Sequence, residues 1–347
     1  MNTFEYKWQS PSNIALIKYW GKYGRQLPCN PSISFTLDQA QTQTSLKIEH
    51  GKSRTPFELN FLFEGVENTS FANKINKKLE GLGEVLPMLK TGISLTVNSF
   101  NTFPHSAGIA SSASSMSALA LCLLEAQYAL DGNNKATSSN LFRQEASGLA
   151  RLLSGSACRS LFPVLGQWGK TQDLPESSDE WAIGIEAHPV FSTYRNDILI
   201  VSRKEKSVSS TAGHNLMTNH PFANARYQQA TVNLQNILPA LKTGNVEVVG
   251  DIMELEALVL HGLMMSSTPS FILLEPNSLN IINEIRQYRT QSGLPLYFSI
   301  DAGPNIHLLY PAEIESRLED FIETRLKPFC VNGQIIKDKV GMGASRI

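Results

Sequence analysis

Cysteine is scarce in this 347-residue chain, and neither sign of charge dominates it. The four cysteines (Cys29, Cys122, Cys158 and Cys330) are widely separated and form no C-x-x-C pair, which argues against a disulfide framework or a zinc cage. The seven histidines include no H-E-x-x-H motif, so we predict no structural metal. A formal charge of −1 gives no reason to expect a nucleic-acid or membrane partner.

Targeting signals and long apolar runs are also missing. The first residues, MNTFEYKWQSPSN, contain no basic region followed by an apolar one, so we expect no signal peptide. The run ALALCLL at 118–124 is far shorter than the roughly 18 residues that a membrane span needs. The expected location is therefore the cytoplasm.

Strand-like and helix-like segments are mixed in both halves of the chain. Segments rich in β-prone residues and bounded by turn residues cover 13–20, 32–37, 42–50, 56–65 and 92–100. Amphipathic patterns predict helices over 223–244, 246–265 and 277–293. Because βα alternation is not strict, the pattern favours an α+β fold. We place a domain boundary near residue 188, which gives domains of 1–188 and 189–347.

The stretch PHSAGIASSASSMSAL at 104–119 combines small residues, a glycine and many serines at the predicted start of a helix. The free N–H groups and the positive dipole end of such a helix can bind phosphate. Gly108 would let the backbone approach the ligand closely, and Ser111 and Ser112 would add hydroxyl groups for phosphate or magnesium. The alternative is a serine N-cap on a core helix.

Two further stretches carry groups suited to an anionic ligand. LLSGSACRSLFP at 152–163 places Arg159 three residues after the Ser154–Ser156 turn, and an arginine fork suits a carboxylate or phosphate. SIDAGPNIHLLY places Asp301 after a predicted strand, and Lys18 lies within the apolar segment NIALIKYWGK. The alternatives are a surface arginine, a turn aspartate bonded to the backbone and a lysine that snorkels to solvent. Taken together, the groups favour ATP-dependent phosphoryl transfer to a small anionic substrate.

These motifs resemble those of the GHMP kinase superfamily, and within it the diphosphomevalonate decarboxylase family. PHSAGIASSAS is similar to the superfamily's P-x-x-x-G-L-x-S-S-A nucleotide loop. NIALIKYWGK, LSGSACRS and DAGPN, as a set and in this order, resemble the decarboxylases. The matches run from residue 13 to residue 305, and NPSISFTL makes the likeness closest to bacterial members.

The resemblance implies a two-domain GHMP kinase fold. Its N-terminal half would be like domain 2 of ribosomal protein S five, its C-terminal half would be ferredoxin-like, and the active site would lie in the cleft between them. It also implies that ATP phosphorylates the tertiary 3-hydroxyl of mevalonate 5-diphosphate, after which loss of phosphate and CO2 gives isopentenyl diphosphate. ATP, Mg²⁺ and a homodimer are expected from the family.

The resemblance also assigns roles to residues. Asp301 would orient or deprotonate the hydroxyl, Lys18 would keep Asp301 ionised, and Arg159 would hold the substrate carboxylate. The residues expected to bind ATP are Pro104, Ser106, Ala107, Gly108, Ile109, Ala110, Ser111 and Ser112, with Ser112 as the candidate Mg²⁺ ligand. The residues expected to bind the rest of the substrate are Tyr19, Lys22, Ser154, Gly155, Ser156, Arg159 and Lys74.

One feature departs from the family pattern. Eukaryotic relatives use an arginine between the early strands and the nucleotide loop to grip the diphosphate, but this chain has no arginine between Arg54 and Arg143. Lys74, Lys77 and Lys78 lie in that region and would substitute as point charges, the alternative being a solvated helix face. Two other substrates therefore stay open: phosphomevalonate, giving isopentenyl phosphate, or the alcohol substrate of another GHMP small-molecule kinase.

Overall fold

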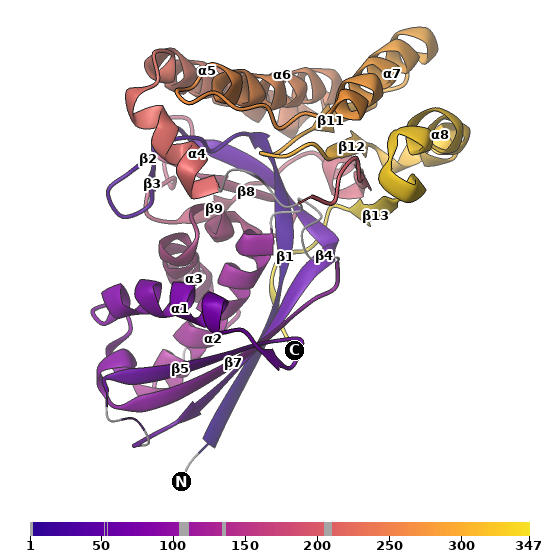
Figure 1. The fold of residues 1–347 in the computed structure, drawn as a ribbon. Coiled ribbons are helices and arrows are strands. Elements are labelled where there is room, and N and C mark those ends of the chain that lie inside the picture. Colours follow the sequence, from indigo (N-terminus) through magenta and orange to yellow (C-terminus); the bar gives the residue numbers. More distant parts are fainter. Residues whose placement is uncertain (1–2, 52, 54, 104–110, 134–136, 205–209) are drawn as a thin grey trace.

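The computed structural model describes residues 3–51, 53, 55–103, 111–133, 137–204 and 210–347. Two halves lie one above the other, and the long strands β1 (Thr3–Ile17) and β4 (Ser32–Glu49) run from the lower half into the upper one (Figure 1). The C-terminal end of β1 and the N-terminal end of β4 therefore lie at the junction of the two halves. Lys18 follows β1 directly and lies at this junction.

A mixed sheet forms the N-terminal half. Its main path runs β14-β1-β4-β7-β5-β6, and β8 and β9 extend it from β4. The further strands are β5 (Phe57–Phe63), β6 (Val66–Glu67), β7 (Ile93–Asn101), β8 (Leu165–Trp168), β9 (Ala182–Gly184) and β14 (Ser345–Arg346). Strands β5 and β7 pair in parallel, and the other strand pairs of this sheet are antiparallel.

Segments 32–37 and 42–50, which the sequence predicts as separate strands, are one continuous strand, β4. The register with β1 shifts between Thr36 and Gln41, so the intervening residues bulge. The carboxylate of Asp338, far along the chain, accepts hydrogen bonds from the main-chain N–H groups of Asp38, Gln39 and Ala40. A local sequence pattern cannot reveal that the bulge is stabilised by so distant a residue.

Helices α1 (Thr69–Leu79), α2 (Ser111–Leu130) and α3 (Asn140–Leu153) pack with this sheet. Helix α2 is long and apolar enough to cross a membrane by composition, yet 83% of that window is buried inside the fold. Two of its serines face the sheet, because Ser114 Oγ is 2.6 Å from Thr42 Oγ1 and Ser117 is hydrogen-bonded to Ser10. Part of the serine-rich pattern therefore serves close packing of α2 on β1 and β4.

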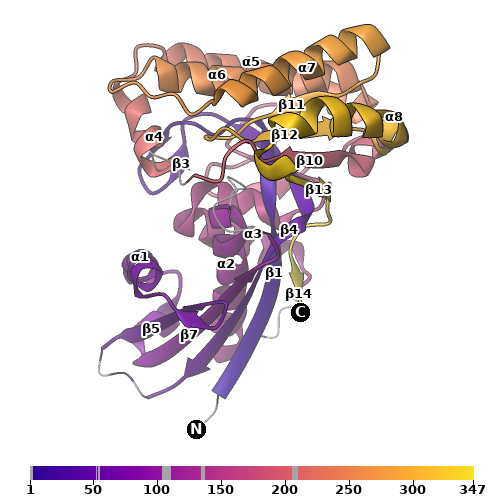
Figure 2. The ribbon, with the colours of Figure 1, turned by 45° about the vertical axis from the view of Figure 1, so that its right-hand side comes forward.

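The C-terminal half contains a four-stranded antiparallel sheet with helices packed on it. The strand order is β11 (Tyr297–Ser299), β12 (Ile306–Tyr310), β10 (Arg195–Leu199) and β13 (Ile335–Lys339). The helices are α4 (Ser210–Leu216), α5 (Ala223–Thr243), α6 (Val246–Met265), α7 (Pro276–Ser292) and α8 (Glu315–Phe321). Figure 2 shows α5, α6 and α7 as one layer above the strands. Antiparallel pairing confirms the α+β class, and the helices predicted over 223–244, 246–265 and 277–293 are confirmed as α5, α6 and α7.

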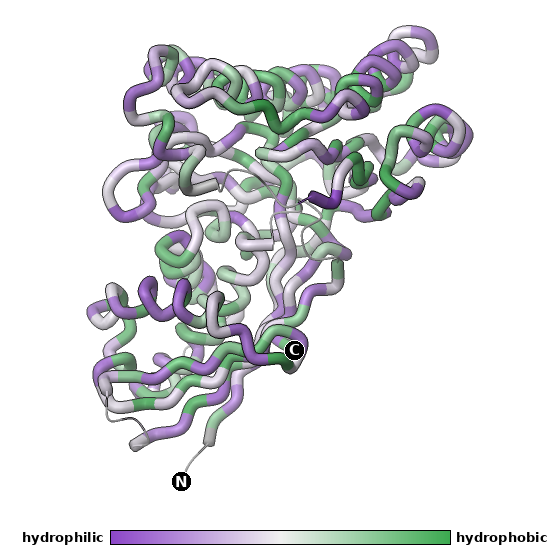
Figure 3. Tube along the Cα trace, in the orientation of Figure 1, coloured by the Kyte–Doolittle hydropathy of each residue, from purple (hydrophilic) through white to green (hydrophobic). Residues whose placement is uncertain are grey.

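The two halves share a hydrophobic cluster. Ile14, Ile33 and Phe35 of the long strands pack in one buried group with Phe191 and Leu234 of the C-terminal half. Strand β14 then returns to pair with β1, so the last residues join the N-terminal sheet. Figure 3 shows apolar stretches running through the junction, while α7 and α8 alternate between hydrophilic and hydrophobic stretches. This shared core fixes the junction at which the candidate site is built.

Candidate active site

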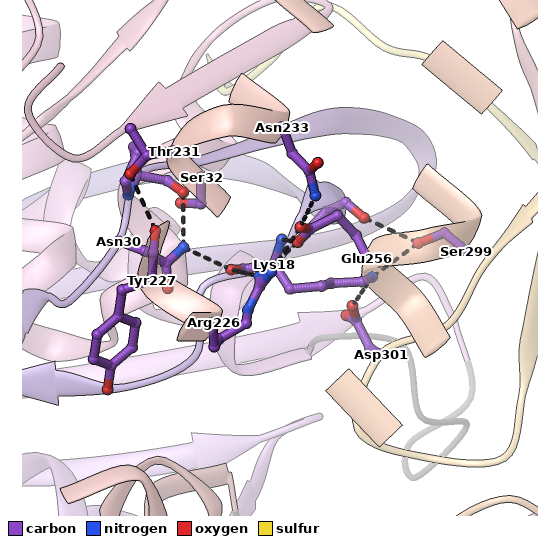
Figure 4. Close-up of polar contacts among 12 residues, drawn as sticks. Lys18, Asn30, Ser32, Arg226, Tyr227, Thr231, Asn233, Glu256, Ser299 and Asp301 are labelled. Carbon is purple, nitrogen blue, oxygen red and sulfur yellow. Dashed lines mark hydrogen bonds and ion pairs between the residues drawn. The ribbon is translucent and has the colours of Figure 1, made fainter. Parts of the chain in front are cut away.

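Lys18 and Asp301 form a buried ion pair between the two halves. Lys18 directly follows β1 and is 2% exposed, and its Nζ lies 2.8 Å from Asp301 Oδ1 and 2.8 Å from Ser299 Oγ. Asp301 follows β11 by two residues, and its side chain is 28% exposed. Figure 4 shows the ammonium group pointing at this carboxylate. Lys18 therefore does not snorkel, and the carboxylate of Asp301 is partly exposed.

The surroundings of Lys18 act on its charge in opposite directions. Burial lowers the pKa of Lys18, while the carboxylates of Asp301 and Glu256 raise it, and the positive charge of Arg159 lowers it further. The net direction is a pKa below the usual lysine value. A lysine of this kind can stabilise negative charge in the site and can also lose its proton more readily than an exposed lysine.

Arg159 lies in the 3-10 helix η3 (Gly155–Leu161) and is buried, so the alternative of a surface arginine is wrong. Its guanidinium donates to Ser34 Oγ at 3.0 Å, to Ser32 Oγ at 2.5 Å and to Asn13 Oδ1 at 3.4 Å. These three acceptors are uncharged, and no carboxylate in the described part of the chain forms an ion pair with Arg159. Burial lowers the pKa of Arg159, while Cys158 and then Asp301 raise it. A buried cation with neutral partners is suited to an anionic ligand.

Tyr19 and the turn that contains Gly155 come together beside this cation. The Tyr19 hydroxyl is buried and has no hydrogen-bond partner among the residues that the structure describes. A Cβ atom at Gly155 would lie 2.8 Å from that hydroxyl, which explains why glycine is needed there. Ser154 and Ser156 flank Gly155 and are half-buried. Buried polar groups normally have hydrogen-bond partners. A buried hydroxyl that lacks a described partner, next to two serines, therefore indicates a site where a polar ligand supplies that partner.

The lysines expected to bind phosphate differ in their positions. Lys22 donates to Gln26 Oε1 at 2.8 Å, and burial lowers its pKa. Lys78, in the last turn of α1, donates to the main-chain oxygen of Leu153, the residue before the serine turn. Burial lowers the pKa of Lys78, and the positive charge of Lys22 lowers it further. Lys74, on the same helix, is exposed, as Lys78 is, but no described contact joins it to this turn. The described contacts therefore bring Lys78, rather than Lys74, to the serine turn.

Two residues of the predicted nucleotide loop, Ser111 and Ser112, lie within the described part of the chain. Pro104, Ser106, Ala107, Gly108, Ile109 and Ala110 lie outside the described residues. Ser111 and Ser112 begin α2, as predicted, with Ser111 half-buried and Ser112 exposed. The first turn of α2 contains no acidic residue, so nothing in it repels an anion at the positive end of this helix.

Sequence reasoning missed a histidine that packs against the site. His214 of α4 accepts the main-chain N–H of Gly21 at 3.0 Å, and its ring lies 4.2 Å from the Tyr19 ring between centroids. Burial, followed by the charges of Lys22 and Arg159, lowers the pKa of His214 to about 3. The imidazole is therefore neutral at pH 7. Its position six residues before His220 gave no signal of this contact.

Sequence reasoning also missed the groups that hold Lys18 and Arg159. Asn13, Ser32 and Ser34 bind the guanidinium of Arg159, and Ser32 and Ser34 lie in the NPSISFTL segment that resembles bacterial members of the family. Glu256 and Arg226 contact the main chain of Lys18. Both belong to helices that the sequence predicts only as amphipathic, with no role given to their polar residues. The one available signal was the position of Glu256 within the apolar run of α6.

Comparisons with known proteins match both halves of the chain. A family model described as the diphosphomevalonate decarboxylase-like N-terminal domain matches residues 10–180, and one described as the mevalonate 5-diphosphate decarboxylase C-terminal domain matches residues 197–342. The chain is 31% identical over 330 residues to the diphosphomevalonate decarboxylase of Saccharomyces cerevisiae, which covers 90% of this chain and 79% of that protein. This chain belongs to the diphosphomevalonate decarboxylase family. The resemblance stated from the sequence is thereby confirmed.

Solved structures of diphosphomevalonate decarboxylases share the fold over the whole chain. The enzyme of Enterococcus faecalis is 29% identical with a TM-score of 0.83, covering 100% of this chain and 99% of that one. The Staphylococcus aureus structure is 27% identical with a TM-score of 0.85, covering 100% and 98%. A complex of MDDEF with MVAPP, AMPPCP and magnesium is 30% identical with a TM-score of 0.84, covering 100% and 99%. The predicted two-domain GHMP kinase fold is confirmed.

Proposed function

We propose that this chain is an ATP-dependent decarboxylase that converts mevalonate 5-diphosphate to isopentenyl diphosphate, with release of ADP, phosphate and CO2, in isoprenoid biosynthesis. The single observation that carries the proposal is the buried Lys18–Asp301 pair at the junction of the halves, with Arg159 close enough for its charge to act on both. Family membership and the MVAPP and AMPPCP bound in a related structure support the substrate pair.

Asp301 acts on the tertiary 3-hydroxyl of the substrate. A tertiary alcohol is a poor nucleophile, and the partly exposed carboxylate of Asp301 is suited to accept its proton or to orient it. Lys18 keeps Asp301 ionised through the 2.8 Å bond and offsets the negative charge that develops during phosphoryl transfer. When phosphate departs, the carboxylate of Asp301 stabilises the positive charge that forms at C3 of the substrate.

Arg159 binds the substrate carboxylate that leaves as CO2. Its three neutral partners hold the guanidinium in place without neutralising it, so an incoming carboxylate meets a preorganised cation. Neutral partners also matter for release, because a carboxylate held too tightly would not lose CO2. Tyr19, Ser154 and Ser156 line the adjacent turn and supply hydroxyl groups for the polar ends of the substrate.

The N-terminus of α2 fits the phosphates of ATP. The helix start supplies unpaired N–H groups, Ser112 is exposed, and the first turn contains no acidic residue. Ser111, Ser112 and the main-chain N–H groups would hold the phosphates, Ser112 would be the candidate ligand of Mg²⁺, and the ion would neutralise phosphate charge. ATP supplies the phosphoryl group that turns the 3-hydroxyl into a leaving group.

The test follows ADP and CO2 together with Mg²⁺-ATP and either mevalonate 5-diphosphate or mevalonate 5-phosphate. The expected result is equal amounts of ADP and CO2 from the diphosphate, and little of either from the monophosphate. A preference for the monophosphate would mean that mevalonate 5-phosphate is the substrate, while the proposed decarboxylation chemistry would stand. ADP without CO2 would identify a kinase instead.

Replacement of Lys78 tests how the chain holds the diphosphate without the missing arginine. Lys78 and Lys22 place two positive charges beside the serine turn, so Lys78→Met should raise KM for the diphosphate about 10-fold or more, the usual worth of one charged hydrogen bond. Its effect on kcat should be small, because the diphosphate end takes no part in the chemistry. Steady-state kinetics at fixed ATP measures both constants.

Lys74→Met is the matched variant on the same helix. Both lysines are exposed, but only Lys78 has a described bond to the residue before the serine turn. We therefore expect the KM of Lys74→Met to stay close to that of the unmodified chain. If KM rises in Lys74→Met and not in Lys78→Met, Lys74 is the residue that contacts the diphosphate, as the sequence predicts.

A further inference from the structure

The main chain of Lys18 is held by groups that take no part in the chemistry proposed above. Its N–H donates to Glu256 Oε2 at 2.8 Å. Its carbonyl oxygen accepts from Arg226 Nη2 at 3.0 Å and from Asn30 Nδ2 at 2.9 Å. Figure 4 shows Lys18 between these residues and Asp301, so one residue connects the polar cluster to the reacting site.

Glu256 is a fully buried carboxylate with a complete set of donors. Its Oε1 accepts from Arg226 Nη1 at 2.7 Å and from Asn233 Nδ2 at 2.6 Å, and its Oε2 accepts from Arg226 Nη2 at 2.6 Å and from the Lys18 N–H. Glu256 is 0% and Arg226 2% exposed. A buried ion pair of this kind adds little net stability over apolar residues of similar volume. Its value therefore lies in what it positions.

Helix α6 contacts the main chains of both members of the catalytic pair. Glu256 binds the N–H of Lys18, and His261, five residues later on the same helix, donates from Nε2 to the main-chain oxygen of Asp301 at 3.1 Å. Five residues of helix span about 7.5 Å, and a helix keeps that spacing rigid. Helix α6 thus fixes Lys18 of the N-terminal half against Asp301 of the C-terminal half.

We propose that Glu256, itself fixed by Arg226 and Asn233, is a positioning residue for Lys18 in the reaction. Its bond to the Lys18 N–H determines where the ammonium group meets Asp301. Misplacement of a catalytic group by about 1 Å can cost about 100-fold in rate, so the bond matters to kcat rather than to substrate binding. The inference deepens the proposed function and rests on it.

The charges around Lys18 give this role a signature in the pH profile. Asp301 from the loop after β11, Glu256 from α6, Arg226 from α5 and Arg159 from η3 face Lys18. Burial lowers the pKa of Lys18, and the carboxylates of Asp301 and Glu256 raise it. Activity that needs protonated Lys18 is lost as pH rises through its pKa. Loss of the Glu256 charge lowers that pKa further, so the alkaline limb of kcat moves to lower pH.

The experiment compares Glu256→Gln with Glu254→Gln. Glu254 lies on the same helix, is buried, and pairs with Arg289 at 2.6 Å and Arg286 at 3.3 Å, without contacting Lys18. Glu256→Gln should lower kcat about 10- to 100-fold, leave both KM values nearly unchanged, and move the alkaline limb to lower pH. Glu254→Gln should retain kcat, and the alkaline limb of its pH profile should stay in place.

Unchanged kcat and pH profile in Glu256→Gln, or an equal loss in Glu254→Gln, would overturn the proposal. If Glu256→Gln does not fold, Asn233→Ala removes one donor to Glu256 and keeps its carboxylate. A kcat loss of a few-fold in Asn233→Ala supports the proposal, and no loss overturns it.

Amide hydrogen exchange at Lys18 should be faster in Glu256→Gln than in Glu254→Gln. A chain that makes neither ADP nor CO2 overturns the proposed function, and the exchange result still decides whether Glu256 holds Lys18.

Discussion

Asp301→Asn is expected to reduce kcat about 10³-fold, within the range that a positioned acid–base group contributes. The substitution keeps the size of the side chain and removes its negative charge. The 3-hydroxyl then has no group to take or orient its proton, and Lys18 loses the carboxylate bonded to its Nζ at 2.8 Å. ATP binds through other residues, so its KM should change little. Release of ADP and CO2 under saturating substrates measures the effect.

Asp197→Asn is the matched control for this substitution. Asp197 of β10 also binds a lysine at 2.8 Å, from Lys337 Nζ, and accepts a bond from the Tyr310 hydroxyl at 2.7 Å. It is 1% exposed and lies outside the candidate site. We expect Asp197→Asn to lower stability and to retain kcat. A fully active Asp301→Asn variant would contradict the mechanism.

Lys18→Met is expected to reduce kcat about 10²- to 10³-fold, the usual cost of removing one preorganised charge-stabilising group. Methionine fills the buried space of the lysine stem but supplies no charge to Asp301 or to the transferring phosphoryl group. The effect should fall on kcat for ADP and CO2 alike. Circular dichroism and thermal unfolding establish that the variant is folded.

The stability of Lys18→Met should behave unlike that of an ordinary broken ion pair. The pKa of Lys18 is lowered on folding, so the unfolded chain binds this proton more tightly and the native chain gains stability as pH rises through the window between the two pKa values. Lys18→Met removes this pH dependence of stability. It also removes the free-energy cost, at pH 7, of burying a lysine whose pKa is lowered by folding. Asp301, which loses the ammonium of Lys18 in this variant, keeps access to water, with 28% exposure.

Lys337→Met provides the opposite pattern. It leaves Asp197 buried at 1% exposure without its cation, so we expect lower stability with kcat retained. Urea unfolding at pH 7 and at alkaline pH, together with kcat, separates the two variants. A larger loss of stability in Lys18→Met than in Lys337→Met would mean that Lys18 serves the fold first.

Several sequence predictions stay predictions. The domain boundary at residue 188 falls between β9 and β10, yet β14 returns to the N-terminal sheet, so the division in space is not a single cut in the sequence. The roles of the individual site residues, the homodimer and the cytoplasmic location also await experiment. Ultracentrifugation of the purified chain would decide the oligomeric state.

The sequence by itself determined the fold class and the family, and it predicted which groups react. Helix periodicity predicted α5, α6 and α7 because the pattern of apolar positions is local. The motifs around Lys18, Arg159 and Asp301 were recognisable for the same reason, since each lies within a short run of residues.

Only the tertiary structure decided how these groups act. Lys18 and Asp301 are 283 residues apart in the chain and 2.8 Å apart in the fold, and no local pattern could show whether Lys18 points inward or snorkels. A glutamate on an amphipathic helix has the same sequence signature whether it is solvated or, like Glu256, buried and bound to Arg226. Burial is a property of contacts between distant segments, so the charges that control this site were fixed only when the two halves packed together.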